Sequence, residues 1–119
     1  MAHPLYVAFI WHQHQPLYKS RETNSAGMSK YRLPWVRLHG TKDYLDLILI
    51  LEKYPQLHQT VNLVPSLILQ LEDYAEGRAI DPYLALALNP AQNLTDPYKQ
   101  YVVNPVSYTH LTLPTKRIV

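Results

Sequence analysis

The chain has 119 residues, which suffices for one modest domain but not for a full α/β barrel of roughly 200 residues or more. Eleven basic and nine acidic residues give a net charge of +2 without a dense run of lysine and arginine, so nothing favours a nucleic-acid partner. Cysteine is absent, which excludes disulfides and thiolate chemistry, and no apolar run suits a signal peptide or membrane span, so we expect a cytoplasmic protein.

The first predicted element is a strand from Leu5 to Trp11, whose unbroken apolar character is typical of a strand covered on both faces in a parallel sheet. It runs into Trp11-His12-Gln13-His14-Gln15-Pro16, where the proline ends it. Because successive side chains of a strand point to opposite faces, His12 and His14 are predicted to share a face. Trp11, on the other face, is predicted to belong to the core. Parallel α/β folds bind ligands beyond the carboxyl ends of their strands, so we expect a site here.

In the middle of the chain the sequence predicts two irregular segments followed by a helix. Residues 18–28 are polar and indicate a mobile loop over the strand end, whereas residues 31–40 are aromatic and irregular. Thr41 is a suitable N-cap, and apolar residues then recur at helical spacing until Tyr54-Pro55. This helix is apolar over much of its circumference, so we expect it to be well buried.

From residue 60 onward the sequence predicts a second strand and further helices. Residues 60–64 form the strand, Pro65 suits the first turn of the next helix, and Gly77 should end it. Shorter helices are expected over 81–88 and from Thr95-Asp96-Pro97 onward. Strand, helical connection, strand and helix make a βαβα pattern, which predicts an α/β fold with a parallel sheet. Because a sheet normally needs three or more strands, this fold looks unfinished.

The tail from Val106 differs in character from the rest. It has no helical periodicity, and it resembles the translation of a sequencing-library adapter. We therefore expect a native segment over 1–104 and a non-native tail over 106–119, and we set the tail aside for the fold. Resequencing the gene would test this, because a native gene that continues past Thr115 in the same reading would contradict it.

The His12/His14 pair has the spacing of a metal half-site, and it equally suits hydrogen bonds to sugar hydroxyls. Further metal ligands could only come from the polar residues of the helix and its flanks: His39, Asp43, Asp46 and His58. Trp35 could stack on a sugar ring or simply pack against the helix. No carboxylate stands at the end of an apolar strand, so the acid pair that glycoside chemistry requires is not evident.

Three blocks of the sequence, taken in order, resemble glycoside hydrolase family 57. They are Ile10-Trp11-His12-Gln13-His14-Gln15-Pro16-Leu17-Tyr18, the segment 33–44, and the segment Val61-Asn62-Leu63-Val64-Pro65-Ser66-Leu67, with an extension at Gln70-Leu71-Glu72-Asp73-Tyr74. The resemblance covers residues 5 to about 101. A lone His-x-His would be weak, but the ordered blocks are specific.

This resemblance implies the N-terminal βαβα portion of an incomplete (β/α)7 barrel that acts on α-glucans by a retaining mechanism. The catalytic glutamate and aspartate of the family lie in later regions, so a chain without them should be inactive. The resemblance assigns His12, His14 and more weakly Gln15 to the substrate subsite, and Trp35 and His39 match a segment of one subgroup. It implies no cofactor and no catalytic metal, and the expected partner is an α-glucan or oligosaccharide.

Two alternatives remain open from the sequence. The first is a metal-dependent hydrolase of the amidohydrolase type, in which His-x-His binds zinc. The second is a non-catalytic sugar-binding module, which would fold cooperatively on its own. We expect instead a marginally stable chain, because open strand edges and uncovered apolar helix faces should remain.

Overall fold

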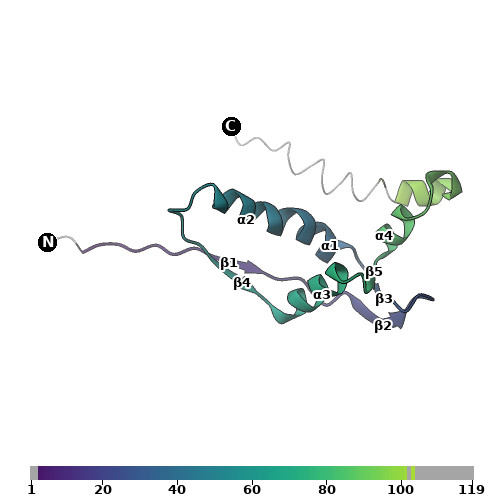
Figure 1. Cartoon of the computed structure of the whole chain (residues 1–119), viewed down its shortest axis with the longest axis horizontal. Helices are drawn as coiled ribbons and strands as arrows, with labels where there is room; N and C mark the ends of the chain where they lie inside the picture. The colour runs from purple at the N-terminus through teal and green to yellow at the C-terminus, as the bar shows by residue number, and fades with distance from the viewer. Residues whose placement is uncertain (1–2, 102, 104–119) are drawn as a thin grey trace. The chain divides into compact units, whose positions relative to one another are not determined.

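The computed structural model of the protein describes residues 3–101 and 103 (Figure 1). The chain divides into two compact units, Met1–Ile80 and Asp81–Val119, and each is described by itself. The tail 106–119 lies outside the described residues, so the expectation that it is non-native stays a prediction.

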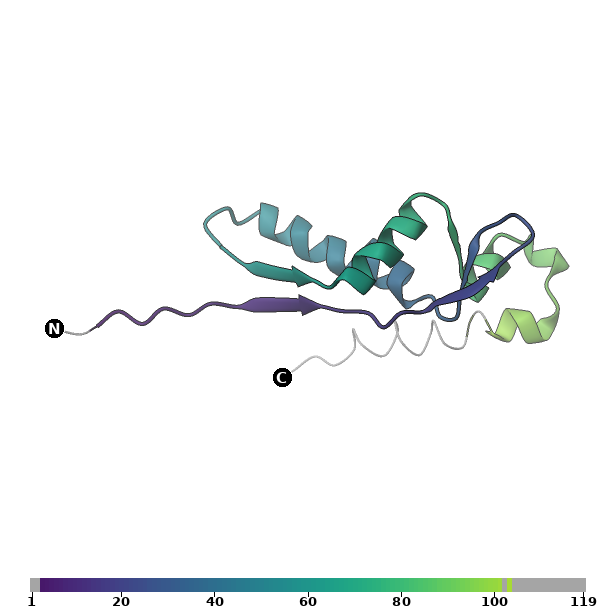
Figure 2. The same cartoon turned by 90° about the horizontal axis from the view of Figure 1, so that it is seen from below.

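A parallel pair of strands forms the framework of the first unit. β1 (Ile10–Gln13) lies beside β4 (Thr60–Leu63), as both views show (Figures 1 and 2), and the pairing joins Ile10 to Thr60 and Gln13 to Leu63. The parallel pairing and the position of β4 confirm the prediction of mixed α/β structure.

The start and the burial of the first strand were predicted wrongly. β1 begins at Ile10 rather than Leu5, because β4 offers partners to only four residues. The apolar run before it is exposed, with Leu5 at 89% and Phe9 at 68%. Within the described residues this sheet has only two strands, so nothing covers the run on either face.

Residues 18–28, predicted as a mobile loop, instead form most of a hairpin. β2 (Lys19–Thr23) runs antiparallel to β3 (Ser29–Tyr31), and β3 pairs in parallel with β5 (Ala79–Ile80). The side-chain oxygen of Asn24 accepts hydrogen bonds from the backbone N–H groups of Ala26 and Met28 and so closes the turn. Gly27 completes it with a φ of 80°, a conformation that favours glycine.

The helix between β1 and β4 begins earlier than predicted. It runs through α1 (Trp35–His39), a π-helical segment η1 (Gly40–Tyr44) and α2 (Leu45–Glu52), so the segment expected to be irregular is largely helical. Pro34 precedes the first turn. Thr41 is therefore not an N-cap, and its hydroxyl donates back to the carbonyl of Arg37 at 2.9 Å.

α3 (Pro65–Ala75) follows β4, starts at the predicted proline, and ends before Gly77, whose φ is 70°. The core of this unit lies where α1 contacts α3 and where α3 contacts β5. Its fully buried side chains include three apolar and two polar ones: Val36, Leu67, Pro34, Gln70 and Asp73.

The prediction that the long helix is well buried is wrong. Leu45, Ile48, Leu49 and Ile50 of α2 each leave 45–53% of their surface exposed. This confirms the expectation that uncovered apolar helix faces remain, because one two-stranded sheet cannot cover the whole circumference of the helix.

The second unit contains short helices. α4 (Pro82–Ala87) begins after Asp81, whose side chain accepts a hydrogen bond from the N–H of Leu84 at 2.9 Å and so caps the helix. A 3₁₀ turn, η2 (Ala91–Asn93), leads to a helix over residues 96–101, as the Thr95-Asp96-Pro97 signal predicts. The rings of Tyr83 and Tyr101 stack with centroids 5.0 Å apart.

Candidate functional site at the carboxyl end of β1

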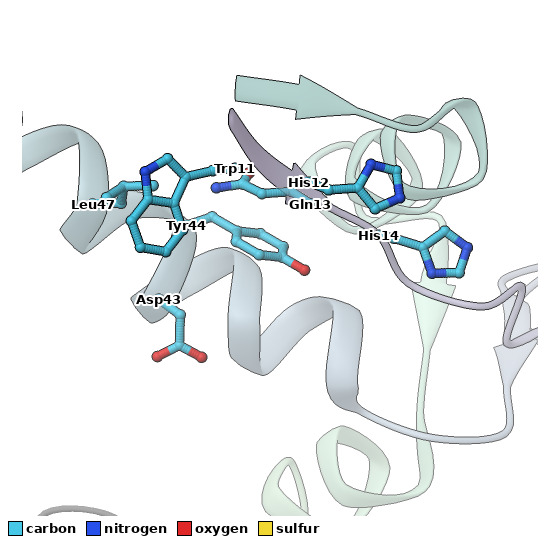
Figure 3. A pocket seen from close by; sticks show the side chains of 7 residues that line it. All are labelled: Trp11, His12, Gln13, His14, Asp43, Tyr44 and Leu47. Atoms are coloured by element: carbon cyan, nitrogen blue, oxygen red, sulfur yellow. The ribbon is translucent and has the colours of Figure 1, made fainter. Parts of the chain in front are cut away.

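A cavity of about 300 Å³ lies at the end of β1, where the sequence predicts a site. One wall is the strand and the other is the helix that follows the hairpin (Figure 3). The lining side chains are Trp11, His12, Gln13, His14, Asp43, Tyr44 and Leu47.

The two histidines share a face, as predicted. Their rings are parallel within 8° and their centroids lie 5.9 Å apart. In Figure 3 both imidazoles project away from the Trp11 and Tyr44 rings, which gather between strand and helix. Trp11 is not a core residue, because it lines the cavity and is 48% exposed.

The helical wall contains Asp43, which was considered from the sequence as a metal ligand, together with two residues that the sequence did not assign to the site. Asp43 and Tyr44 belong to η1, and Leu47 follows in α2. π-helical segments are uncommon and often occur at functional sites, and they shift which side chains share a helix face. The sequence puts Tyr44 and Leu47 on one face of the helix, three residues apart, but it does not show that this face borders the end of β1.

Gln15, predicted to contact substrate, is engaged within the protein. Its amide nitrogen donates to the Tyr44 hydroxyl at 3.1 Å, and its amide oxygen accepts from the Tyr18 hydroxyl at 3.3 Å. Burial, and to a lesser extent the neighbouring Tyr44, raise the pKa of Tyr18, which keeps this donor protonated. In this arrangement Gln15 joins the turn after β1 to the helix.

α3 also holds the turn after β1 in place. Ser66 donates to the carbonyl of Gln15 at 3.1 Å. The buried amide of Gln70 donates to the carbonyl of Pro16 at 2.9 Å and accepts from the N–H of Tyr18 at 2.7 Å. The backbone that presents His14 is thus fixed by hydrogen bonds from one helix.

Trp35 and His39 do not line the cavity. His39 forms a hydrogen bond to Asp43 through Nδ1, and its ring centroid lies 6.0 Å from that of Trp35 and 6.3 Å from that of Tyr44. The structure thus places His39 next to two residues that line the site, whereas Trp35 lies one helical turn further from it. Their predicted contact with a sugar stays a prediction.

Metal binding finds no support in the part of the chain that the structure describes. No group of three or more His, Asp or Glu side chains is arranged there to hold a metal ion. Of the metal ligands considered from sequence, Asp46 forms an ion pair with Lys42 at 2.6 Å, and His58 is exposed in a loop.

One comparison decides the family. The model of glycosyl hydrolase family 57 matches residues 8–114 and so covers most of the chain. The chain belongs to glycosyl hydrolase family 57. No curated protein and no solved structure matches it. Among the described residues, no helix has the length and apolar character needed to cross a membrane.

The cavity offers groups that could hydrogen-bond a sugar but few groups that could react with it. Neutral imidazole offers one donor and one acceptor, which suits sugar hydroxyls. Asp43 is the single carboxylate among the described lining residues, and it is already bonded to His39. Retaining glycoside hydrolysis needs two carboxyl groups on either side of the scissile bond, and the described residues here do not supply them.

Proposed function

We propose that this chain forms the N-terminal, substrate-binding portion of a retaining glycoside hydrolase or glucanotransferase that acts on α-glucans. In this proposal β1 and β4 are the first strands of an incomplete (β/α)7 barrel. His12 and His14 hydrogen-bond the sugar at the scissile bond, while Gln15, Trp35 and His39 take lesser parts. The cytoplasmic location expected from the sequence belongs to the same proposal.

The observation that carries the proposal is the position of the paired histidines within a family 57 chain. They stand at the carboxyl end of a parallel strand, share one face, and border a cavity large enough for a sugar ring. Ligands of parallel α/β folds bind at this edge, and family membership makes a carbohydrate the substrate class.

We further propose that the chain binds α-glucan without cleaving it, because the reacting carboxylates lie elsewhere. Gln15 then acts mainly as a brace for the site, since both ends of its amide are occupied by tyrosine hydroxyls.

An NMR titration of the isotope-labelled chain with maltoheptaose tests the binding. We expect saturable shifts at the end of β1, with affinity reduced about three- to tenfold in His12→Ala and in His14→Ala, the range for one lost hydrogen bond. His58→Ala is the matched control, because His58 is exposed and does not line the cavity. Equal binding by all four proteins would contradict the proposed role.

A reducing-sugar assay tests the second half of the proposal. We expect no release of reducing ends from soluble starch by the chain as it stands. Sustained hydrolysis that disappears on heating would show that the chain contains its own acid pair and would overturn this part of the proposal.

A further inference from the structure

The pairing of β1 with β4 brings Asn62 beside His12. The two residues are direct register partners in the parallel ladder. Backbone hydrogen bonds fix this register at both ends: the N–H of Thr60 donates to the carbonyl of Phe9 at 3.4 Å, and the N–H of Val64 donates to the carbonyl of Gln13 at 3.3 Å. Register partners on neighbouring strands lie about 5 Å apart and point to the same face.

Asn62 therefore belongs to the face that carries His12 and His14. The opposite face carries Trp11 and Gln13, which lie toward the helix in Figure 3. Asn62 is also the residue before the last of β4, so it stands at the same carboxyl edge as the histidines.

The amide of Asn62 is available for a ligand. The side chain is exposed, and within the described residues it forms no hydrogen bond. Two other amides near the site, those of Gln15 and Gln70, are engaged within the protein: Gln15 bonds two tyrosines, and Gln70 bonds three backbone groups. Among these three amides, the described structure therefore leaves only that of Asn62 open to solvent.

We propose that Asn62 is a further sugar-binding residue, which with His12 forms a two-strand contact to one saccharide unit. A side-chain amide offers both donor and acceptor groups, and a neutral imidazole beside it offers one of each. Together they match the neighbouring hydroxyls of a pyranose, each of which can donate and accept. This inference rests on the proposed function, since it extends the same site to a second strand.

The experiment repeats the maltoheptaose titration on the full chain with Asn62→Ala. We expect affinity to fall about three- to tenfold, the range for a lost hydrogen bond to a neutral group. Thr60→Ala is the matched control, because Thr60 lies on the same strand and the same face but two residues further from the carboxyl edge. We expect its affinity to stay within about twofold of the parent.

The outcomes separate this inference from the proposed function. If His12→Ala weakens binding but Asn62→Ala stays within twofold of the parent, Asn62 is not a binding residue and the proposed function stands. If His12→Ala has no effect either, the proposed function fails and this inference fails with it. Should Asn62→Ala not fold, Asn62→Asp decides by the same criterion, because it keeps the size and the acceptors but lacks the donor.

Discussion

Lys19 Nζ lies 2.6 Å from Oδ2 of Asp73, and this contact ties the first strand of the hairpin to the last turn of α3. The same carboxylate accepts a hydrogen bond from the Tyr31 hydroxyl at 2.8 Å and one from Arg78 Nε at 3.2 Å. Asp73 thereby connects α3 to β2, to β3 and to the residue before β5. Its role is structural, because the carboxylate is buried and its oxygens already accept from three side chains of the protein.

Asp73→Asn should destabilise the chain strongly. The side chain of Asp73 is 3% exposed, and its carboxylate accepts hydrogen bonds from three donors. The substitution leaves Lys19 without its counter-charge and turns one of the accepting oxygens into an NH2 group, which cannot accept. We expect the free energy of unfolding to fall by about 2–4 kcal/mol, measured by urea unfolding. Glu22→Gln removes the exposed ion pair with Lys30 and should cost less than about 1 kcal/mol. Equal losses in the two variants would contradict the role of Asp73.

The same carboxylate predicts an acid-sensitive component of stability. Burial alone would raise the pKa of Asp73, but hydrogen bonds from Lys19, Tyr31 and Arg78 outweigh it and hold the pKa below its usual value. A group whose pKa is lower in the folded state contributes stability that is present above the unfolded pKa of about 4 and is lost as pH falls through the folded value.

Unfolding free energies measured from pH 7 down to pH 3 should therefore decline as the pH drops below about 5. In Asp73→Asn this component should be missing, so its curve should be flatter over the same range. Parallel curves for the parent and Asp73→Asn would show that other carboxylates cause the decline.

Tyr44→Phe should loosen the turn that presents His14. The substitution removes the hydroxyl that accepts from Gln15 at 3.1 Å, while the ring remains in the cavity wall. We expect a loss of about 0.5–1.5 kcal/mol, the range for one hydrogen bond, together with NMR shifts at residues 14–16. Tyr54→Phe is the control, since Tyr54 is 49% exposed and its hydroxyl has no hydrogen bond among the described residues. Matching results for the two variants would contradict a bracing role for Tyr44.

Local signals in the sequence predicted part of the fold well. Pro65 fixes φ at the start of α3, and Gly77 adopts the positive φ that directly follows the C-terminal end of this helix. The strand at Thr60–Leu63 and the shared face of His12 and His14 likewise follow from residues a few positions apart. Such signals are read correctly because the causes lie within one or two turns of the chain.

The errors arose where distant residues decide the structure. The hairpin that was predicted as a loop is held by Asp73, which lies 54 positions from Lys19 in the sequence. The early start of the helix and its π-helical segment place Tyr44 in the cavity wall, a position that was not predicted. Neither the distant contact with Asp73 nor the π-helical segment can be seen in the hydrophobic period of a short segment.

The approach of α3 to the π-helical segment predicts a coupled pair of substitutions. A Cβ atom added to Gly40 would lie 2.6 Å from Cδ2 of Leu71, closer than two carbon atoms can approach without movement. Gly40 has a helical backbone, with φ of −63°, so alanine gains no backbone strain and should even favour the helix by about 1 kcal/mol. The steric conflict with Leu71 opposes that gain and decides whether the substitution raises or lowers the free energy of unfolding.

Gly40→Ala should therefore cost about 1–2 kcal/mol in the parent chain, because it overpacks a close contact between helices. In a Leu71→Ala background the conflict disappears, and the same substitution should become neutral or stabilising by up to about 1 kcal/mol. Urea unfolding of the parent, the two single variants and the double variant measures the coupling energy. If the two substitutions were additive, the contact between Gly40 and Leu71 would not limit how closely α3 approaches the helix that carries Tyr44.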